Sequence, residues 1–221
     1  LNVLFNNAGI MHGKDDDAGS TPEDIWGLTL GVNDLASYGR KEHRTPNLDR
    51  LAVRGMRFTS AYCAQPICSP SRAAILTGKA PARLHLTTFL PGRADAPSQK
   101  LLHPKMNQQL PLEEKTLAEH LKAAGYATGL IGKWHLGGRG FLPTDQGFDF
   151  YYAGQANTKP SETEGGKGEF DLTRKAEEFI EQNRDKRFFL FLAHNSPHIA
   201  YTAKQELIEK NKGAFEPVYA A

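Results

Sequence analysis

The chain has 221 residues, of which 39% are hydrophobic and 24% charged, and its formal net charge is +2. This composition is typical of a globular protein of one or two domains. No apolar run approaches the roughly 20 residues that a membrane-spanning helix needs. The charge is too balanced to indicate nucleic acid, and two cysteines cannot form a disulfide framework or a four-cysteine zinc site. We therefore expect neither a membrane nor a nucleic acid as partner.

The charge is unevenly distributed along the chain. Residues 1–33 carry one lysine and five carboxylates, a net charge of −4, so residues 34–221 carry +6. This change predicts a boundary between a short segment, 1–33, and a domain, 34–221. The chain opens on Leu1 without a basic and then apolar leader. We expect it to be part of a longer protein, whose leader is missing or never existed.

Apolar runs and capping residues predict the elements in chain order. Short apolar runs indicate strands, and the last of them, six apolar residues long, should be covered on both faces. The strands are expected at 3–5, 56–61, 127–131 and 188–193. Helices are indicated where a cap or proline precedes apolar residues at helical spacing. They are expected from Thr21, from Thr45 to a stop at Gly55, and over 69–77, 116–124, 171–183 and 203–212.

Two segments, 81–111 and 153–169, are rich in glycine, proline and polar residues and should be irregular. The remaining strands and helices alternate, which predicts an α/β fold with a largely parallel sheet. We expect the strand at 3–5 to lie beside those at 127–131 and 188–193.

The run Cys68-Ser-Pro-Ser-Arg72 carries the strongest chemical signal. Pro70 at a first helical position places Cys68 just before a helix N-terminus, where unpaired N–H groups and the helix dipole favour an anion. Arg72, one turn later, can donate two hydrogen bonds to a tetrahedral anion. These residues alone leave two interpretations open: a nucleophile with an anion site, or a buried cysteine before an ordinary helix.

Three further residues are candidates for the same site. Lys133 and His135 stand two apart just beyond a predicted strand, where an extended backbone points both side chains to one side. His198 follows the last strand. Each alone is as readily a solvent-exposed lysine or a loop histidine, but together with Cys68 they indicate a site. At the carboxyl edge of a parallel sheet they should converge on Cys68.

The other histidines and the second cysteine lack such partners. His120 is expected in the apolar face of its helix, and Cys63 is expected to be a buried strand residue that forms no disulfide with Cys68. The remaining histidines are His12, His43, His85, His103 and His194.

The Cys68 run resembles the Cys-x-Pro-x-Arg signature of the sulfatase family. Its flanks agree: Thr45-Pro-Asn-Leu-Asp-Arg precedes it and Leu-Thr-Gly-Lys79 follows. The run Gly129-Leu-Ile-Gly-Lys-Trp-His-Leu-Gly137 resembles a second signature of the family, and Pro197-His198 resembles the Pro-His loop of the family. The resemblance covers residues 34–221. It implies an alkaline-phosphatase-like α/β sandwich with a largely parallel sheet, incomplete at both ends.

The resemblance also implies a chemistry. In the family the cysteine is oxidised by a formylglycine-generating enzyme, and the hydrated formylglycine attacks sulfur and releases the alcohol; its second hydroxyl then loses a proton and expels sulfate. By this resemblance, Lys133 contacts the formylglycine and the sulfate, His135 supports the formylglycine, and His198 contacts the sulfate. The implied cofactor is a divalent cation, Ca²⁺, bound in part by residue 68. Sulfated small molecules or glycans are the implied substrates. By analogy with the family, the implied location is secreted or periplasmic.

The metal site departs from the family pattern. Asp34-Leu-Ala-Ser-Tyr-Gly39 is present, but the paired aspartates expected before it are not. Instead, Asn6-Asn-Ala-Gly9 and Asn33 resemble the short-chain dehydrogenase/reductase family. The second Asp-Asn pair of metal ligands is expected beyond Ala221. Asp15-Asp-Asp17 is either a partial substitute, since hard cations need only clustered oxygens, or a solvated acidic loop.

Four interpretations of function follow from these residues. The leading one is a sulfatase fragment that cleaves sulfate monoesters when complete. A phosphonate or phosphate monoester hydrolase uses the same motif, and a catalytically dead fragment without a metal site fits the missing aspartates. An NAD(P)-dependent oxidoreductase requires a glycine-rich nucleotide loop, which the sequence lacks.

Overall fold

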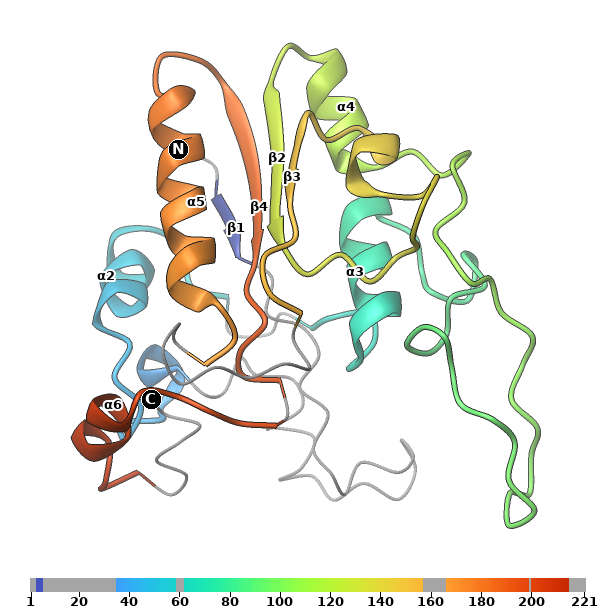
Figure 1. The fold of residues 1–221 in the computed structure, drawn as a ribbon, viewed down its shortest axis with the longest axis horizontal. Coiled ribbons are helices and arrows are strands. Elements are labelled where there is room, and N and C mark those ends of the chain that lie inside the picture. The colour runs from blue at the N-terminus through green and yellow to red at the C-terminus, as the bar shows by residue number, and fades with distance from the viewer. Residues whose placement is uncertain (1–2, 6–34, 59–61, 157–165, 199, 215–221) are drawn as a thin grey trace.

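The computed structural model describes residues 3–5, 35–58, 62–156, 166–198 and 200–214 (Figure 1). The strands in this part of the chain are β1 (Val3–Phe5), β2 (Ala127–Gly132), β3 (Phe150–Tyr152) and β4 (Phe188–Ala193). The helices are α2 (Pro46–Arg54), α3 (Cys68–Thr77), α4 (Leu117–Ala123), α5 (Glu169–Gln182) and α6 (Gln205–Lys210), with the 3-10 helices η2 (Ala36–Tyr38) and η3 (Pro143–Gln146). A helix lies between each two successive strands, but α2, α3 and α4 follow one another with no described strand between them, so the predicted alternation is met only in part.

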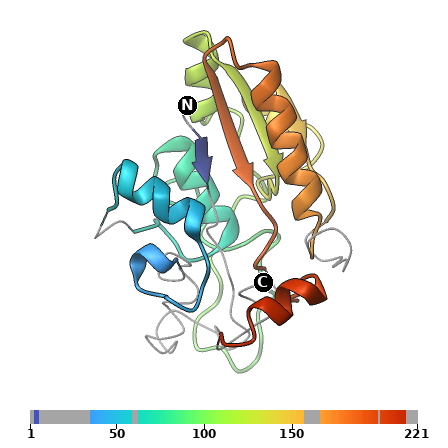
Figure 2. The same cartoon turned by 90° about the vertical axis from the view of Figure 1, so that its left-hand side faces the viewer.

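The four strands form one parallel sheet in the order β1-β4-β2-β3. The register pairs Leu4 with Phe191 and Gly129 with both Leu190 and Phe150. Figure 2 shows β1 at the edge of the sheet, next to β4. The prediction that the strands at 3–5, 127–131 and 188–193 lie side by side is thus confirmed, and β4 is the middle one of the three.

Helices cover both faces of this sheet. α5 lies on one face, and α3 and α4 lie on the other (Figure 1). All six residues of β4 are buried, and they alternate between the two faces. One core contains Phe189 and Phe191 with residues of α3 and α4, and the other contains Phe188 and Leu190 with residues of α5. The six consecutive apolar residues predict a strand covered on both faces, and the structure confirms this.

Local signals also set the helix boundaries. Thr116 caps α4: its side chain accepts a hydrogen bond from the Glu119 N–H at 3.2 Å, and Glu119 accepts one from the Thr116 N–H at 2.9 Å. Helix α3 begins at Cys68 itself, with Ile67 as the N-cap, one residue earlier than predicted. The helix ends at Thr77, and Gly78 caps it in the left-handed conformation, at φ = 68°. The segment 81–111 is irregular, as expected.

Several expectations are corrected by the structure. The strand predicted at 56–61 is wrong for residues 56–58, which pair with no strand and leave Met56 and Phe58 exposed. His120 is exposed, because α4 buries Ala118 on the opposite side of the helix. Cys63 is half-buried and outside any strand. Strand β3 was not expected from the sequence, because its apolar run is short and follows directly on Asp149.

Other expectations lie outside the described residues. They concern the helix from Thr21, the asparagines near residue 6 and the acidic run Asp15–Asp17. Within the described helices, none is both long and apolar enough to cross a bilayer.

Candidate active site

The carboxyl ends of β2 and β4 meet at a tight junction. Gly132 pairs with Ala193, and the next N–H, that of Lys133, donates a 2.8 Å hydrogen bond to the Ala193 carbonyl. Gly132 has φ = 100°, and a Cβ atom there would lie 2.0 Å from the Ala193 carbonyl oxygen. Only glycine fits both the conformation and the space. The junction fixes the start of the chain after β2, which carries Lys133 and His135, beside the last residue of β4.

Cys68 lies against this junction at the N-terminus of α3. The residue is 3% exposed, and the Lys133 ammonium donates to its sulfur at 3.3 Å. The free N–H groups of a helix N-terminus and its dipole favour negative charge at this place. The structure therefore joins the two candidates that the sequence placed 65 residues apart.

Arg72 completes the contact between α3 and the loop after β2. It is 3% exposed and donates from Nη1 to the Lys133 carbonyl at 2.8 Å. Its Nε–H is buried and has no hydrogen-bond partner among the described residues. Burial lowers the pKa of Arg72 to about 10, although Cys68 and Tyr151 oppose the shift, so the guanidinium stays charged at neutral pH. Arg72 is thus a buried cation that also fixes the backbone of Lys133.

His135 has a strained backbone and a defined tautomer. Its φ of 60° is in the left-handed region, which a residue other than glycine adopts only at an energetic cost. Residues strained in this way cluster at functional sites. Its Nε2 lies 2.7 Å from the Leu90 carbonyl oxygen. A carbonyl only accepts, so Nε2 carries a proton in this contact. Its other nitrogen, Nδ1, has no partner within strict hydrogen-bond geometry among the described residues, but His135 lies near enough to Cys68 for a hydrogen bond between the two side chains to lower the pKa of the thiol.

The cations around Cys68 make it an unusually acidic thiol. Burial alone raises its pKa, but His135, Lys133 and Arg72 lower it further, to about 6. Burial in turn lowers the pKa of Lys133, partly opposed by the nearby Cys68. At neutral pH the sulfur is therefore a thiolate that occupies the centre of a site built for an anion.

His198 lies on the turn that follows β4. Its N–H donates to the Asn195 carbonyl at 3.1 Å. The same turn is held to α5 by Glu169, which accepts from the Ser196 N–H at 2.7 Å and pairs with the Nδ1 atom of His194. The turn leaves the same edge of the sheet as Lys133. A contact of the His198 imidazole with the substrate remains a prediction.

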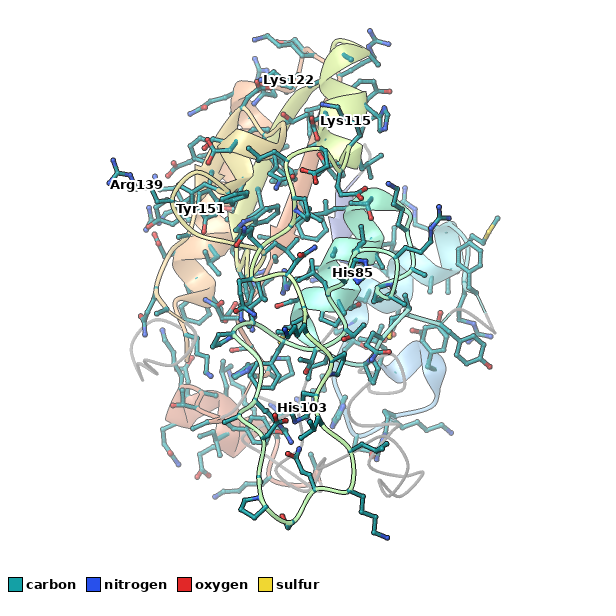
Figure 3. The ribbon with its side chains drawn as sticks, turned by 90° about the vertical axis from the view of Figure 1, so that its right-hand side faces the viewer. His85, His103, Lys115, Lys122, Arg139 and Tyr151 are labelled. Atoms are coloured by element: carbon teal, nitrogen blue, oxygen red, sulfur yellow. The ribbon has the colours of Figure 1, made fainter. Side chains whose placement is uncertain are left out.

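The other described histidines lie elsewhere or serve the framework. His85 and His103 belong to the irregular segment, with His103 on its outer loop, where Gln99 contacts its ring at 2.8 Å (Figure 3). His194 is the partner of Glu169. Cys63 and Cys68 form no disulfide with each other, as expected. His12 lies outside the described residues.

Sequence reasoning missed the residues that support this site. Glu169, Asn195 and the buried Lys167 lie in or beside segments expected to be loop. Tyr151, labelled in Figure 3, belongs to the unpredicted strand β3 and lies near enough to Arg72 for the guanidinium to influence its pKa. No local pattern marks these residues, because their role depends on contacts distant in sequence.

The described residues do not form a metal site. Nowhere in the described ranges do three or more His, Cys, Asp or Glu side chains gather as a cation would require. Cys68 has basic side chains, not carboxylates, as its described neighbours. This part of the chain alone therefore does not fit a divalent cation.

Comparison with known proteins agrees with this geometry. The family model described as Sulfatase matches residues 25–221. The chain is 49% identical over 127 residues to arylsulfatase A of Bos taurus, and 46% identical over 125 residues to N-acetylgalactosamine-6-sulfatase of Sus scrofa. Each match covers 56% of this chain and 23% of the relative, so the matched part is about a quarter of these relatives' length.

A solved structure shares the fold. The PsFucS1 sulfatase from Pseudoalteromonas sp. superimposes with a TM-score of 0.62 and 27% identity, over 85% of this chain and 46% of that one. The fold is therefore the alkaline-phosphatase-like α/β fold that the sequence predicts, and relatives of this kind use in general a metal and a formylglycine. Because the family model matches residues 25–221 of this chain and both signatures meet at one site, the chain belongs to the sulfatase family.

Proposed function

We propose that the protein hydrolyses sulfate monoesters, with a formylglycine formed from Cys68 as the nucleophile. The observation that carries this proposal is the 3.3 Å contact between the Lys133 ammonium and the Cys68 sulfur at the N-terminus of α3. The sulfur stands where the hydroxyls of a hydrated formylglycine would lie. That group supplies a nucleophile which a thiol cannot replace, because its second hydroxyl can expel the bound sulfate.

Each site residue has a distinct task in this proposal. Lys133 binds an oxygen of the sulfate and the hydroxyl of residue 68, and Arg72 holds the Lys133 backbone while adding positive charge. His135 exchanges a proton with residue 68 through Nδ1, since Nε2 is engaged by the Leu90 carbonyl. His198 contacts the sulfate. All four act on an anion, which explains why the site is basic.

The proposed cofactor is a divalent cation, Ca²⁺. It would supply positive charge at the developing alkoxide and at the residue-68 oxygen. Of the described residues, only residue 68 is a candidate ligand, so its other ligands would come from outside the described residues. Asp15–Asp17 are candidates in that part of the chain.

The proposed substrate is a sulfated small molecule or glycan. The relatives named arylsulfatase A and N-acetylgalactosamine-6-sulfatase support this class, and the basic site accepts an anionic ester. Maturation requires a formylglycine-generating enzyme as partner. We propose a secreted or periplasmic location on the analogy of the family.

Maturation and selectivity test the proposal together. The chain is co-expressed with a formylglycine-generating enzyme, and peptide mass analysis reads the replacement of sulfur by oxygen at Cys68. The matured protein is then incubated with matched aryl sulfate, aryl phosphonate and aryl phosphate esters, with Cys68→Ala as background. We expect conversion of Cys68 and a preference for the sulfate. An unconverted thiol in an accessible peptide would refute the nucleophile, and a preference for phosphonate or phosphate would assign the alternative hydrolase.

A further inference from the structure

Ser69, the residue after Cys68, is a buried serine that the proposed mechanism does not use. It lies in the first turn of α3 and is fully buried. Its hydroxyl accepts a 3.1 Å hydrogen bond from the N–H of Leu90, which is 21 residues further along the chain. Both partners are buried, so breaking this hydrogen bond would leave the N–H unsatisfied. Ser69 therefore fixes the backbone of Leu90 against the start of α3.

The other backbone group of Leu90 contacts the candidate site. Its carbonyl oxygen lies 2.7 Å from Nε2 of His135 and accepts the hydrogen bond, because a carbonyl cannot donate. The Leu90 side chain belongs to the same buried core as Trp134, the residue before His135. Leu90 is thus held by Ser69 through its N–H, and it holds His135 through its carbonyl.

Both ends of this chain of contacts lie at Cys68. Ser69 follows Cys68 directly in the chain, and His135 lies near enough to Cys68 for a hydrogen bond between the two side chains. Lys133, two residues before His135, contacts the Cys68 sulfur at 3.3 Å and brings the same loop to the site. The φ of 60° at His135 is a strained conformation, which persists only where surrounding contacts hold it. The hydrogen bond to the Leu90 carbonyl is such a contact.

We infer that Ser69 is a positioning residue of this site: by holding the Leu90 backbone, its hydroxyl fixes the orientation of the His135 imidazole beside residue 68. This inference rests on the proposed function. The Nε2–H of His135 donates to the Leu90 carbonyl, so Nδ1 is the nitrogen that exchanges a proton with residue 68. If the carbonyl moves, the ring loses the contact that sets its orientation. Misplacement of a reacting group by about 1 Å can cost about a hundredfold in rate.

Ser71 offers a matched control on the same helix. It is as fully buried as Ser69, but its hydroxyl has no hydrogen-bond partner among the described residues. Both serines stand at undefined positions of the Cys-x-Pro-x-Arg signature, so we expect neither substitution to prevent conversion of Cys68. Ser69→Ala and Ser71→Ala therefore remove the same group from α3, and only the first removes the contact with Leu90.

The Nε2 proton of His135 tests this role without turnover. In the full, unmodified 221-residue chain, ¹⁵N–¹H correlation spectra should show this proton, because a hydrogen bond to a buried segment slows its exchange with water. His135→Gln assigns the signal. Ser69→Ala should broaden or remove it, whereas Ser71→Ala should leave it and Ser69→Thr, which retains the hydroxyl, should restore it. An unchanged signal in Ser69→Ala would overturn the inference.

Kinetics of the matured protein separate this inference from the proposed function. Rates on an aryl sulfate are normalised to the converted fraction of Cys68, which peptide mass analysis gives. Ser69→Ala should lower kcat about tenfold or more and change KM little, because His135 acts on a proton and not on sulfate binding. An equal kcat in Ser69→Ala and the parent would refute the role of Ser69 while the sulfatase stands. A parent that cleaves no sulfate ester would refute the proposed function, and the proton signal would still decide whether Ser69 holds His135.

Two signals of the parent chain keep the test decisive should Ser69→Ala not fold. The Leu90 amide should exchange slowly with solvent, because it is buried and donates to the Ser69 hydroxyl. The ¹⁵N shifts of the His135 ring should show a proton on Nε2. Fast exchange at Leu90, or a proton on Nδ1 in place of Nε2, would overturn the inference.

Discussion

The Lys133 ammonium lies 3.3 Å from the Cys68 sulfur, although 65 residues separate them in the chain. The contact exists because Lys133 directly follows the carboxyl end of β2, and the first turn of α3, which begins at Cys68, lies beside that end. Arg72 strengthens it by donating to the Lys133 carbonyl at 2.8 Å. One unit is therefore formed by Cys68, the Lys133 cation beside it and Arg72, which holds the Lys133 backbone.

This unit predicts an acidic thiol in the unmodified protein. We expect Cys68 to titrate with a pKa of about 6, because His135, Lys133 and Arg72 outweigh the effect of burial. The pH dependence of its ¹³Cβ chemical shift, assigned with Cys68→Ala, measures this value without requiring access by a reagent. Lys133→Met should raise the pKa. Cys63 is an internal control, because burial raises its pKa; equal titration of both thiols near pH 9 would contradict the prediction.

The same shift predicts how stability depends on pH. Between pH 6 and 9 the thiol of Cys68 is ionised in the folded chain and protonated in the unfolded chain. The unfolded state then binds more protons, so the contribution of Cys68 to the free energy of unfolding rises with pH across this window and is lost as pH falls through about 6. Urea unfolding at several pH values, compared with Cys68→Ala, should show this slope only in the parent chain.

The β2–β4 junction should tolerate no side chain at Gly132. Gly132→Ala is expected to destabilise the fold by about 3 kcal/mol or more, since a left-handed backbone and a clash add their costs. The clash is with the Ala193 carbonyl oxygen, 2.0 Å from the added Cβ. The control is Gly138→Ala, where no atom lies within 4 Å of the added Cβ, and it should change stability by about 0.5 kcal/mol or less. Equal urea midpoints for the two variants would contradict this account.

Much of the fold could be predicted because its signals are local. Six consecutive apolar residues identify β4, and the capping box at Thr116 identifies the start of α4. The convergence of Lys133 on Cys68 also follows from sequence, since the carboxyl ends of parallel strands share one edge. Resemblance to the sulfatases then supplied the chemistry that these residues alone left open. The predicted division at residue 33 stays a prediction.

The remaining features depend on contacts that no local pattern encodes. Residues 56–58 have a strand-like composition, but a strand also needs a partner, and the described sheet gives them none. β3 has only three residues and is defined by its pairing with β2. Lys167 is buried, and the backbone of Gly166 and Lys167 lies against Thr202 and Asn195, which are distant in sequence. Periodicity could not have placed His120 either, because a seven-residue helix presents too narrow a buried face.

Arg72 should matter for stability as well as for charge. Arg72→Met removes the donor to the partly buried Lys133 carbonyl, and an unsatisfied group of this kind costs up to about 1–3 kcal/mol. The variant should also raise the pKa of Cys68, because one of the cations that lower it is lost. Arg83→Met, at an exposed arginine, is the control. A change in stability without a change in the Cys68 titration would show that Arg72 is structural only.

The last prediction concerns calcium. A catalytic metal supplies several kcal/mol of transition-state stabilisation, which corresponds to roughly a thousandfold or more in rate. The described residues of this chain offer no group of three or more metal-ligating side chains, and Asp15–Asp17 form the longest acidic run in its first 33 residues. We therefore expect the matured 221-residue chain to turn over an aryl sulfate slowly, with little difference between added CaCl₂ and added chelator. The measurement is the initial rate, corrected with Cys68→Ala. A calcium-stimulated rate that is abolished both by Cys68→Ala and by replacing Asp15–Asp17 with asparagines would show this expectation wrong and would identify the acidic run as a metal site.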